Sequence, residues 1–259
     1  AGDGLSGGKY DHPVLPLADD HAAAARFGGI GLGPGGDIRE GGGDGLFCGG
    51  FLGPQQADQD GHGFGAGGGA VQVKLGGAIG GGAGAGVNNI TINGGTITAV
   101  GASSGAGIGS GSGAKADNIT INGGKITAIG GSDAAGIGSS GDWWEDIGDC
   151  SNITINDGEI IAKGGQDAAG IGSGTRGSAK NITINGGKVD ATGGFFGAGI
   201  GGGRLGQAEN ITITGGDISA KGGSSGAGIG GGERKDGTGI KITGGSVSAT
   251  GGGFAAGNG

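Results

Sequence analysis

Residues 118–138 read Asn-Ile-Thr-Ile-Asn-Gly-Gly-Lys-Ile-Thr-Ala-Ile-Gly-Gly-Ser-Asp-Ala-Ala-Gly-Ile-Gly. Apolar and polar residues alternate over 119–122, so the isoleucines face one side and the polar residues face the other. The glycine pair 123–124 then lets the chain turn at no steric cost. A second alternating segment follows at 125–129, and a glycine-rich third segment at 135–138. The stretch therefore predicts two β-strands and a short third side, each with an inward apolar stripe.

The same pattern returns with a 29-residue period. The spacings between successive anchoring isoleucines are 29, 34, 29, 29 and 29, and the one exception corresponds to a five-residue insertion. These anchors are Ile90, Ile119, Ile153, Ile182, Ile211 and Ile240. A second series with the same period lies on the third side: Ile79, Ile108, Ile137, Ile171, Ile200 and Ile229. One unit cannot bury its apolar stripes alone, so the units are expected to stack.

When the units stack, each strand pairs in parallel with the equivalent strands of the neighbouring units, ~4.8 Å away. The predicted fold is all-β: a single-stranded, right-handed parallel β-helix, or β-solenoid, with three-sided 29-residue coils. We expect about seven or eight coils. A collagen helix is excluded because glycine does not occupy every third position, and helical repeats are excluded because each helical glycine costs about 1 kcal/mol.

The repeat defines two regions of the chain. Residues 71–259 are predicted to form the β-helix domain, and residues 1–70 to form an irregular segment with a cap and degenerate first coils. In that segment, residues 15–25 are a candidate capping helix. Further repeat domains in a longer parent chain, or end-to-end stacking of modules, are open possibilities.

Composition limits the possible partners. Glycine contributes 81 of the 259 residues, and the formal net charge is −8. Such an acidic chain is poorly suited to nucleic acid or to anionic membranes. Because no apolar run approaches the ~18 residues of a spanning helix, we also expect no membrane insertion. The absence of an initiator Met and of a signal peptide fits a processed secreted chain or an excised part of a longer one.

The outward side chains of the second strand carry alternating charges. In register, one column contains Lys125, Glu159, Lys188 and Asp217. Cross-strand ion pairs of this kind contribute roughly 0.2–1 kcal/mol each. The alternative is a solvated face without stable pairs.

The inserted loop, residues 142–150, is the first candidate site. It contains both tryptophans of the chain and four carboxylates: Asp142, Trp143, Trp144, Glu145, Asp146 and Asp149. Aromatic faces beside acidic acceptors are typical of sugar-binding surfaces. The carboxylates, with Asp146 and Asp149 as ligands, are an alternative Ca²⁺ site, and no other cofactor is expected. A purely structural loop is the third possibility, with Cys150 joined to Cys48 in a disulfide or both thiols left free.

Two stacked turns form the second candidate. Asp133 and Asp167 occupy the same turn of neighbouring coils and are the residues expected to be catalytic if the protein is an enzyme. Carboxyls about 5–5.5 Å apart suit a retaining glycosidase, although an ordinary solvated turn explains both residues equally. The next coil places Phe195 and Phe196 at this turn, where they are predicted to form an apolar platform for a ligand.

The outward Thr and Asn side chains of the first strand form the third candidate. They are expected to build a flat two-column polar face: Thr91, Asn93, Thr120, Asn122, Thr154, Asn156, Thr183, Asn185, Thr212 and Thr214. Regular Thr-x-Thr faces are similar to those of ice-binding β-solenoids, but the Asn column departs from that pattern. Stacked Thr and Asn ladders also stabilise a β-solenoid without any ligand.

The motifs Asn-Ile-Thr-Ile-Asn-Gly-Gly and Gly-Ala-Gly-Ile-Gly-Gly-Gly of residues 78–259 resemble the glycine-rich arrays of large secreted or cell-wall-anchored bacterial surface proteins. The resemblance implies a parallel β-helix and an extracellular location, secreted or attached to the cell surface. Proteins with such arrays are adhesin-like or carbohydrate-binding-like and share no single activity. The segment 1–70 and the 142–150 loop depart from the arrays.

These observations lead to three functional hypotheses. The first is a non-catalytic extracellular scaffold or adhesin module that contacts a carbohydrate or another cell-surface ligand through the 142–150 loop. The second is a polysaccharide lyase or glycoside hydrolase that uses Asp133 and Asp167. The third is an ice-binding solenoid that uses the Thr-x-Asn face.

Overall fold

The computed structural model describes residues 77–82, 84–142 and 148–254. They belong to the larger of two compact units, Asp44–Gly259. The predicted cap and degenerate coils of residues 1–70 lie outside the described residues. No helix in the described part of the chain is long and apolar enough to cross a membrane.

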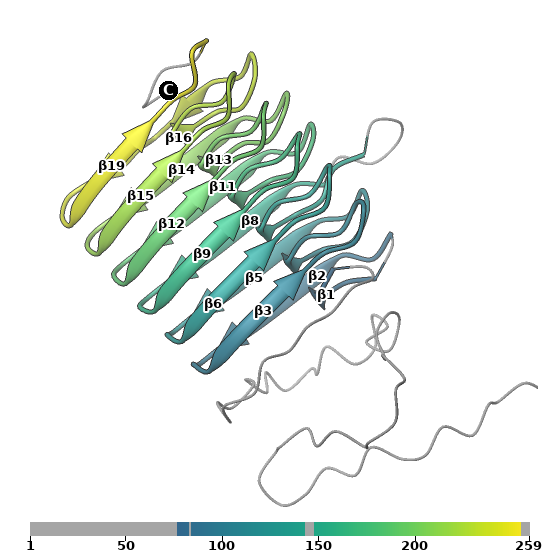
Figure 1. The fold of residues 1–259 in the computed structure, drawn as a ribbon, viewed down its shortest axis with the longest axis horizontal. Helices are drawn as coiled ribbons and strands as arrows, with labels where there is room; N and C mark the ends of the chain where they lie inside the picture. Colours follow the sequence, from purple (N-terminus) through teal and green to yellow (C-terminus); the bar gives the residue numbers. More distant parts are fainter. Residues whose placement is uncertain (1–76, 83, 143–147, 255–259) are drawn as a thin grey trace, which may run out of the picture. The chain divides into compact units, whose positions relative to one another are not determined.

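All the strands described belong to three parallel sheets, and Figure 1 shows their strands stacked as successive turns of one winding. The first sheet contains the Asn-Ile-Thr strands: β2 (Val87–Ile92), β5 (Ala116–Ile121), β8 (Cys150–Ile155), β11 (Ala179–Ile184), β14 (Ala208–Ile213), β17 (Gly237–Thr238) and β18 (Lys241–Ile242). The second contains β3 (Thr96–Val100), β6 (Lys125–Ile129), β9 (Glu159–Lys163), β12 (Lys188–Thr192), β15 (Asp217–Lys221) and β19 (Ser246–Thr250). The third, on the glycine-rich side, contains β1 (Ile79–Gly80), β4 (Ile108–Gly109), β7 (Ile137–Gly138), β10 (Ile171–Gly172), β13 (Ile200–Gly201) and β16 (Ile229–Gly230).

The predicted three-sided parallel β-helix is confirmed. Every described strand pairs with its equivalent in a neighbouring coil, and the register follows the 29-residue period. The insertion does not disturb this register, because Ile119 still pairs with Ile153, and Ile121 with Ile155. The described residues form six turns, and the further one or two expected turns fall outside the described residues.

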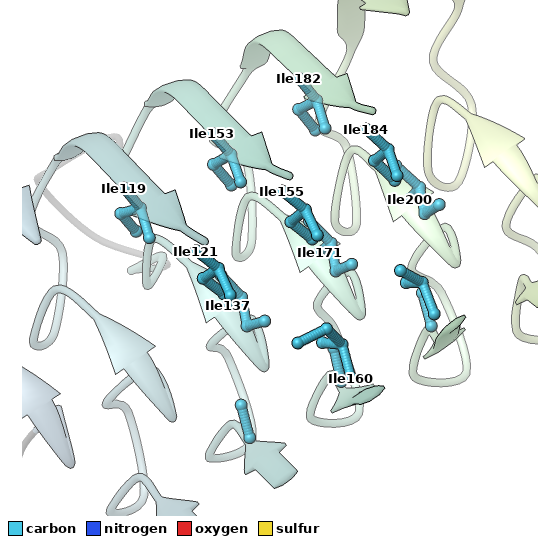
Figure 2. Packing of buried hydrophobic residues seen from close by; sticks show 14 of the residues in the cluster. Ile119, Ile121, Ile137, Ile153, Ile155, Ile160, Ile171, Ile182, Ile184 and Ile200 are labelled. Atoms are coloured by element: carbon cyan, nitrogen blue, oxygen red, sulfur yellow. The ribbon is translucent and has the colours of Figure 1, made fainter. Parts of the chain in front are cut away.

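The core consists of isoleucine columns that run along the stack. Ile119, Ile153 and Ile182 lie over one another and are completely buried. Figure 2 shows this column beside the parallel one of Ile121, Ile155 and Ile184. Burial of one such side chain stabilises the fold by roughly 1.5–3 kcal/mol. The repeated isoleucines therefore hold the coils in register through a dry interior.

The alternation predicted from the anchor isoleucine onward is present, but the first strand of each coil begins earlier, and its alternation is interrupted at the asparagine before that isoleucine. The asparagine before each anchor isoleucine adopts a left-handed conformation: Asn89, Asn118, Asn152, Asn181 and Asn210, with φ between 55° and 66°. In β5 this places Ala116 and Ile119, three residues apart, both inside the core. Asparagine tolerates this conformation better than most residues, and Gly239 takes the position in the last coil with φ 67°.

The third side requires glycine for close backbone packing. Gly138 has φ 134°, and a Cβ atom there would collide with the carbonyl oxygen of Gly172 in the next coil. The glycine after the third-side isoleucine meets the same obstacle in the other coils that have a described successor, which explains the Ile-Gly pairs of β1, β4, β7, β10 and β13. The high glycine content thus serves tight stacking as well as turns.

Cys150 is a free thiol at the start of β8, so the disulfide to Cys48 considered above is not formed in the structure. It lies in an inward column between Ala116 and Ala179 and is 1 % exposed. A partner thiol would have to enter the solenoid core to reach it. Burial, reinforced by the negative charge of Asp117, raises the pKa of this thiol well above its usual range. Cys48 itself lies outside the described residues.

The predicted column of alternating charges is also present. Glu159 pairs in register with Lys125 on one side and Lys188 on the other, and Lys188 pairs with Asp217. The Lys125 Nζ and Glu159 Oε2 atoms are 3.2 Å apart, but about half of each side chain is exposed. At that exposure the pair contributes no more than about 1 kcal/mol.

Candidate functional site

The candidate site lies where two turns of each coil meet beside the glycine-rich side. In each coil, one turn precedes the short strand of the glycine-rich side and another turn follows it. A backbone amide in the turn that follows this strand donates a hydrogen bond to a carbonyl in the turn that precedes the equivalent strand of the preceding coil. Thus Arg204 N donates to the Asp167 carbonyl (2.7 Å), and Glu233 N donates to the Phe196 carbonyl (2.9 Å). Residues distant in sequence therefore share one corner of the solenoid, which we call the acidic corner: Asp133, Asp167, Thr175, Phe195, Phe196, Arg204 and Glu233.

Arg204 organises the acidic corner. Its Nε atom donates a hydrogen bond to Glu233 Oε2 at 3.0 Å, and its Nη1 atom lies 3.7 Å from Asp167 Oδ1. The guanidinium carbon lies 4.1 Å from the centre of the Phe196 ring. A planar guanidinium can pair with carboxylates along its edge while its face contacts an aromatic ring. One side chain thus joins three successive coils.

Asp167 is not the solvated turn residue that one interpretation of the sequence allowed. Only 10 % of its side chain is exposed, and its Oδ1 atom has no hydrogen-bond partner among the described residues. Burial raises the pKa of this carboxyl, the positive charge of Arg204 lowers it, and the charges of Asp133 and Glu233 raise it further. Asp167 is therefore a buried carboxyl whose ionised form is destabilised by its surroundings.

Asp133 lies one coil earlier at the equivalent turn. The two turns stack as predicted, since Asp167 N donates to the carbonyl of Ser132 at 2.9 Å. The Asp133 carboxylate accepts a hydrogen bond from the Thr175 hydroxyl at 3.2 Å, and its carbonyl accepts from Thr175 N at 3.2 Å. Both aspartates predicted to act in an enzyme are thus engaged with neighbouring turns of the solenoid.

Phe195 and Phe196 form the aromatic part of the corner. Their ring centroids are 4.7 Å apart at an angle of 71°, and Phe195 is 52 % exposed. Phe196 N donates to the carbonyl of Gln166 at 3.2 Å, which places the pair in the coil after Asp167. Edge-to-face contact with Phe196, which is itself backed by Arg204, orients the Phe195 ring toward solvent. The predicted apolar platform is therefore a half-exposed phenylalanine beside a charged cluster.

The inserted loop lies only partly within the described residues. Trp143, Trp144, Glu145 and Asp146 lie outside them, whereas both ends of the loop are held by the solenoid. On one side Gly141 N donates to the carbonyl of Asp133 at 2.9 Å. On the other, the Gly148 carbonyl accepts from the Ser139 hydroxyl at 2.5 Å, and the Asp149 carboxylate accepts from Ser178 N at 2.9 Å.

The Ca²⁺ site considered for this loop lies partly outside the described residues, since Asp146 is not among them, while Asp149 accepts a hydrogen bond from a backbone amide of the next coil. Asp142, at the other end, lies at the surface and is half-buried. Within residues 77–82, 84–142 and 148–254, no group of three or more His, Cys, Asp and Glu side chains is arranged to hold a metal ion.

The Thr and Asn columns lie in register along the first sheet, as predicted. Asn122 donates to Asn93, Asn156 to Asn122 and Asn185 to Asn156, at 2.7–2.8 Å, and the Thr214 hydroxyl continues the ladder to Asn185 at 3.0 Å. A second, shorter ladder joins three of the left-handed asparagines: Asn181 donates to Asn152 at 3.1 Å, and Asn210 donates to Asn181 at 3.3 Å. Many side-chain amides of this face therefore form hydrogen bonds with the equivalent residues of neighbouring coils.

Sequence reasoning missed Thr175, Arg204 and Glu233. All three lie four residues after the isoleucine of the third side, a position whose residue type changes from coil to coil. One signal was available in the sequence. The number of residues between Asp167 and Arg204 equals the number between Phe196 and Glu233. The link between the two turns became recognisable only from the hydrogen bonds between coils.

Comparison with known proteins supports the fold. The family model described as Beta helix repeat matches residues 90–112, 119–141, 153–175, 182–204 and 211–233. Neither the search of curated proteins nor that of solved structures finds a match. The five matches begin at anchor isoleucines, one per coil, and agree with the three stacked sheets in supporting a parallel β-helix built from repeats.

Proposed function

We propose that this protein is a non-catalytic extracellular scaffold of adhesin type that binds a glycan beside the acidic corner. The observation that carries the proposal is the half-exposed Phe195 ring, supported by Phe196 and Arg204. Sugar rings stack on aromatic faces, and neighbouring charged groups hydrogen-bond with their hydroxyls. The resemblance of the repeats to bacterial surface-protein arrays supports the extracellular location.

The rigidity of the corner favours a binding role. Arg204 is held by Glu233, Asp167 and Phe196 at once, and its backbone amide is bonded to the preceding coil. A ligand that contacts such a preorganised surface need not order it, so less binding free energy is lost. The Arg204 guanidinium already lies between the carboxylates of Asp167 and Glu233. These carboxylates disfavour an acidic sugar, so a neutral sugar is the better ligand.

The 142–150 loop extends the proposed surface. Gly141 and Thr175 donate to the same carbonyl, that of Asp133, so the beginning of the loop is attached to the acidic corner. The tryptophans that follow Asp142 are the natural second aromatic contact for a glycan longer than one sugar. In this proposal Trp143, Trp144 and Phe195 contact neighbouring units of one oligosaccharide.

The decisive experiment is a glycan and polysaccharide screen scored for both retention and product release, followed by solution affinity measurements. Phe195→Ala and the double change Trp143→Ala/Trp144→Ala are each expected to weaken binding by at least about tenfold. Phe254→Ala is the matched control. Phe254 is 88 % exposed and occupies the position equivalent to Phe196 in the turn two coils later. It should leave the affinity per chain unchanged.

Other results would replace the proposal. Release of reducing ends or unsaturated products, abolished by Asp133→Asn or Asp167→Asn, would instead establish a polysaccharide-active enzyme. Thermal hysteresis that is lost on Thr154→Tyr would establish an ice-binding face. Equal loss of affinity in Phe195→Ala and Phe254→Ala would contradict a specific site at the acidic corner.

A further inference from the structure

The carboxyl of Asp167 lacks the hydrogen bonds that a buried charge requires. Its side chain is 10 % exposed, and no described residue donates a hydrogen bond to its Oδ1 atom. A buried carboxylate without donors is energetically unfavourable, and protonation removes its charge. The charge state of Asp167 is therefore coupled to the position of the cation beside it.

That cation is the Arg204 guanidinium, which contacts other groups more closely. Its Nη1 atom lies 3.7 Å from Asp167 Oδ1, beyond the roughly 2.7–3.2 Å of an N–H···O hydrogen bond. Its Nε atom donates to Glu233 Oε2 at 3.0 Å, and its central carbon lies 4.1 Å from the centre of the Phe196 ring. The guanidinium is therefore hydrogen-bonded to Glu233, whereas its contact with Asp167 Oδ1 is a longer ion pair.

Ionisation of Asp167 changes the balance between these contacts. A guanidinium–carboxylate hydrogen bond is about 2.7–2.9 Å long, so Nη1 of Arg204 must approach Oδ1 by about 1 Å to form one. Asp167 lies in the coil before Arg204, and Glu233 lies in the coil after it. Movement toward Asp167 is therefore movement away from Glu233, and it shifts the guanidinium relative to the Phe196 ring.

The charged groups around Asp167 determine where it changes charge. Burial is the largest influence and raises the pKa of this carboxyl above its ordinary value of 3.8. The charge of Arg204 lowers the pKa, whereas the charges of Asp133, one coil earlier, and of Glu233 raise it further. Arg234 lies 3.7 Å from Glu233 but is 81 % exposed, so solvent screens its charge. Asp167 therefore ionises at a higher pH than an ordinary surface aspartate.

We propose that Asp167 positions Arg204, and that ionisation of Asp167 weakens glycan binding on the Phe195 ring. The effect on binding rests on the proposed function, whereas the effect on Arg204 does not. With Asp167 neutral, Arg204 stays hydrogen-bonded to Glu233. It then also stays against Phe196, whose edge-to-face contact at 4.7 Å holds Phe195. With Asp167 ionised, the guanidinium moves toward the preceding coil and supports this aromatic pair less, so more conformational freedom is lost on binding.

The first test needs no ligand. NMR of the full chain follows the Arg204 Nε–H signal over a pH series that starts at the ordinary aspartate value of 3.8. This signal reports on the guanidinium because it depends on the ring current of Phe196 and on the hydrogen bond to Glu233. It should titrate in wild type, and that titration should be lost in Asp167→Asn. The variant retains Asp133 and Glu233, so a titration that persists in it belongs to them and overturns the proposal.

The second test measures the affinity for a neutral oligosaccharide retained in the screen, over the same pH series. The affinity of wild type should fall by about fivefold or more as the pH rises, and Asp167→Asn should remove this fall. Asp217→Asn is the matched control, because Asp217 is exposed at the start of β15, whereas the acidic corner lies beyond the ends of the strands of that sheet. It should keep the wild-type profile. Circular dichroism of each variant establishes that the coils are folded.

The two tests separate failure of the binding site from failure of the positioning role. If no oligosaccharide binds at any pH, the proposed function fails, and the Arg204 signal alone decides whether Asp167 positions the guanidinium. If an oligosaccharide binds with a pH profile that Asp167→Asn leaves unchanged, the proposed function stands and the role of Asp167 is overturned. An Arg204 signal that does not respond to pH, or an affinity that rises with pH, overturns it as well.

Discussion

The guanidinium carbon of Arg204 lies 4.1 Å from the ring centre of Phe196 in the same coil, while its Nε atom donates to Glu233, one coil later. This side chain therefore connects neighbouring coils in a region where the backbone is mostly turn. It also supplies the positive charge closest to the buried carboxyl of Asp167.

Removing Arg204 should destabilise the solenoid. In Arg204→Ala, Asp167 and Glu233 lose their shared cation, and Phe196 loses the contact on one face. We expect a loss of about 1–3 kcal/mol in the free energy of unfolding, reduced from the value for a fully buried pair because Arg204 is 29 % exposed. Urea unfolding measures it. Arg204→Lys should recover only part of the loss, and full recovery would show that charge alone matters.

The buried carboxyl of Asp167 predicts a specific pH dependence. Its pKa is raised in the folded state from the ordinary value of 3.8, so the stability contributed by its neutral form is present at low pH and lost as the pH rises through the folded pKa. In the Asp167→Asn variant, the side chain at this position does not titrate. The stability of this variant relative to wild type should therefore increase as the pH rises above 3.8 and level off above the folded pKa. Unfolding curves over a pH series test this, and a difference independent of pH would contradict it.

The left-handed asparagines predict an unusual order of substitutions at Asn152, where φ is 57°. Asn152→Ala should cost about 1–2 kcal/mol, since an alanine must adopt the left-handed conformation without a compensating side-chain hydrogen bond. Asn152→Gly should cost less, because glycine adopts this conformation readily, as Gly239 does in the last coil. Thermal unfolding of both variants gives the order. A glycine variant less stable than the alanine variant would contradict the proposed cost of the left-handed conformation, because both variants lose the same side-chain hydrogen bonds.

Cys150 should behave as a small core residue. Its neighbours in the column are Ala116 and Ala179, so Cys150→Ala is expected to change stability by less than about 1 kcal/mol. In a Cys48→Ser background, the Cys150 thiol should react with a thiol reagent only at the rate of unfolding, because it is buried and its raised pKa keeps it protonated. Rapid labelling of the folded protein would show that this coil opens locally.

Most of the fold could be predicted because its determinants are local and repeated. Alternation in Ile119-Thr120-Ile121 specifies a strand with one apolar face, and the 29-residue period places each face over its copy. The left-handed Asn118 was missed because the alternating pattern suits a straight strand equally well. The φ angle of Asn118 and the burial of both Ala116 and Ile119 show that the alternation is interrupted between these two residues.

The candidate site was predicted in part. The stacking of the Asp133 and Asp167 turns, and the nearby Phe195 and Phe196, followed from the period alone. The burial of Asp167 and its proximity to Arg204 did not, because Arg204 lies in a different turn of the following coil. The tryptophan loop stays a prediction, since residues 143–147 lie outside the described part of the chain.

The sequence by itself determined the three-sided parallel β-helix and its register, because a periodic apolar pattern can bury itself only by stacking on its own copies. The tertiary structure decided which outward side chains meet at the corners. Those contacts join two different turns of neighbouring coils, as Arg204 joins Asp167, and their geometry depends on how the backbone folds between Ile171 and Ile200. The repeat period determines which residues stack in one column along the solenoid. The distance between neighbouring columns is set by the conformation of the folded coil.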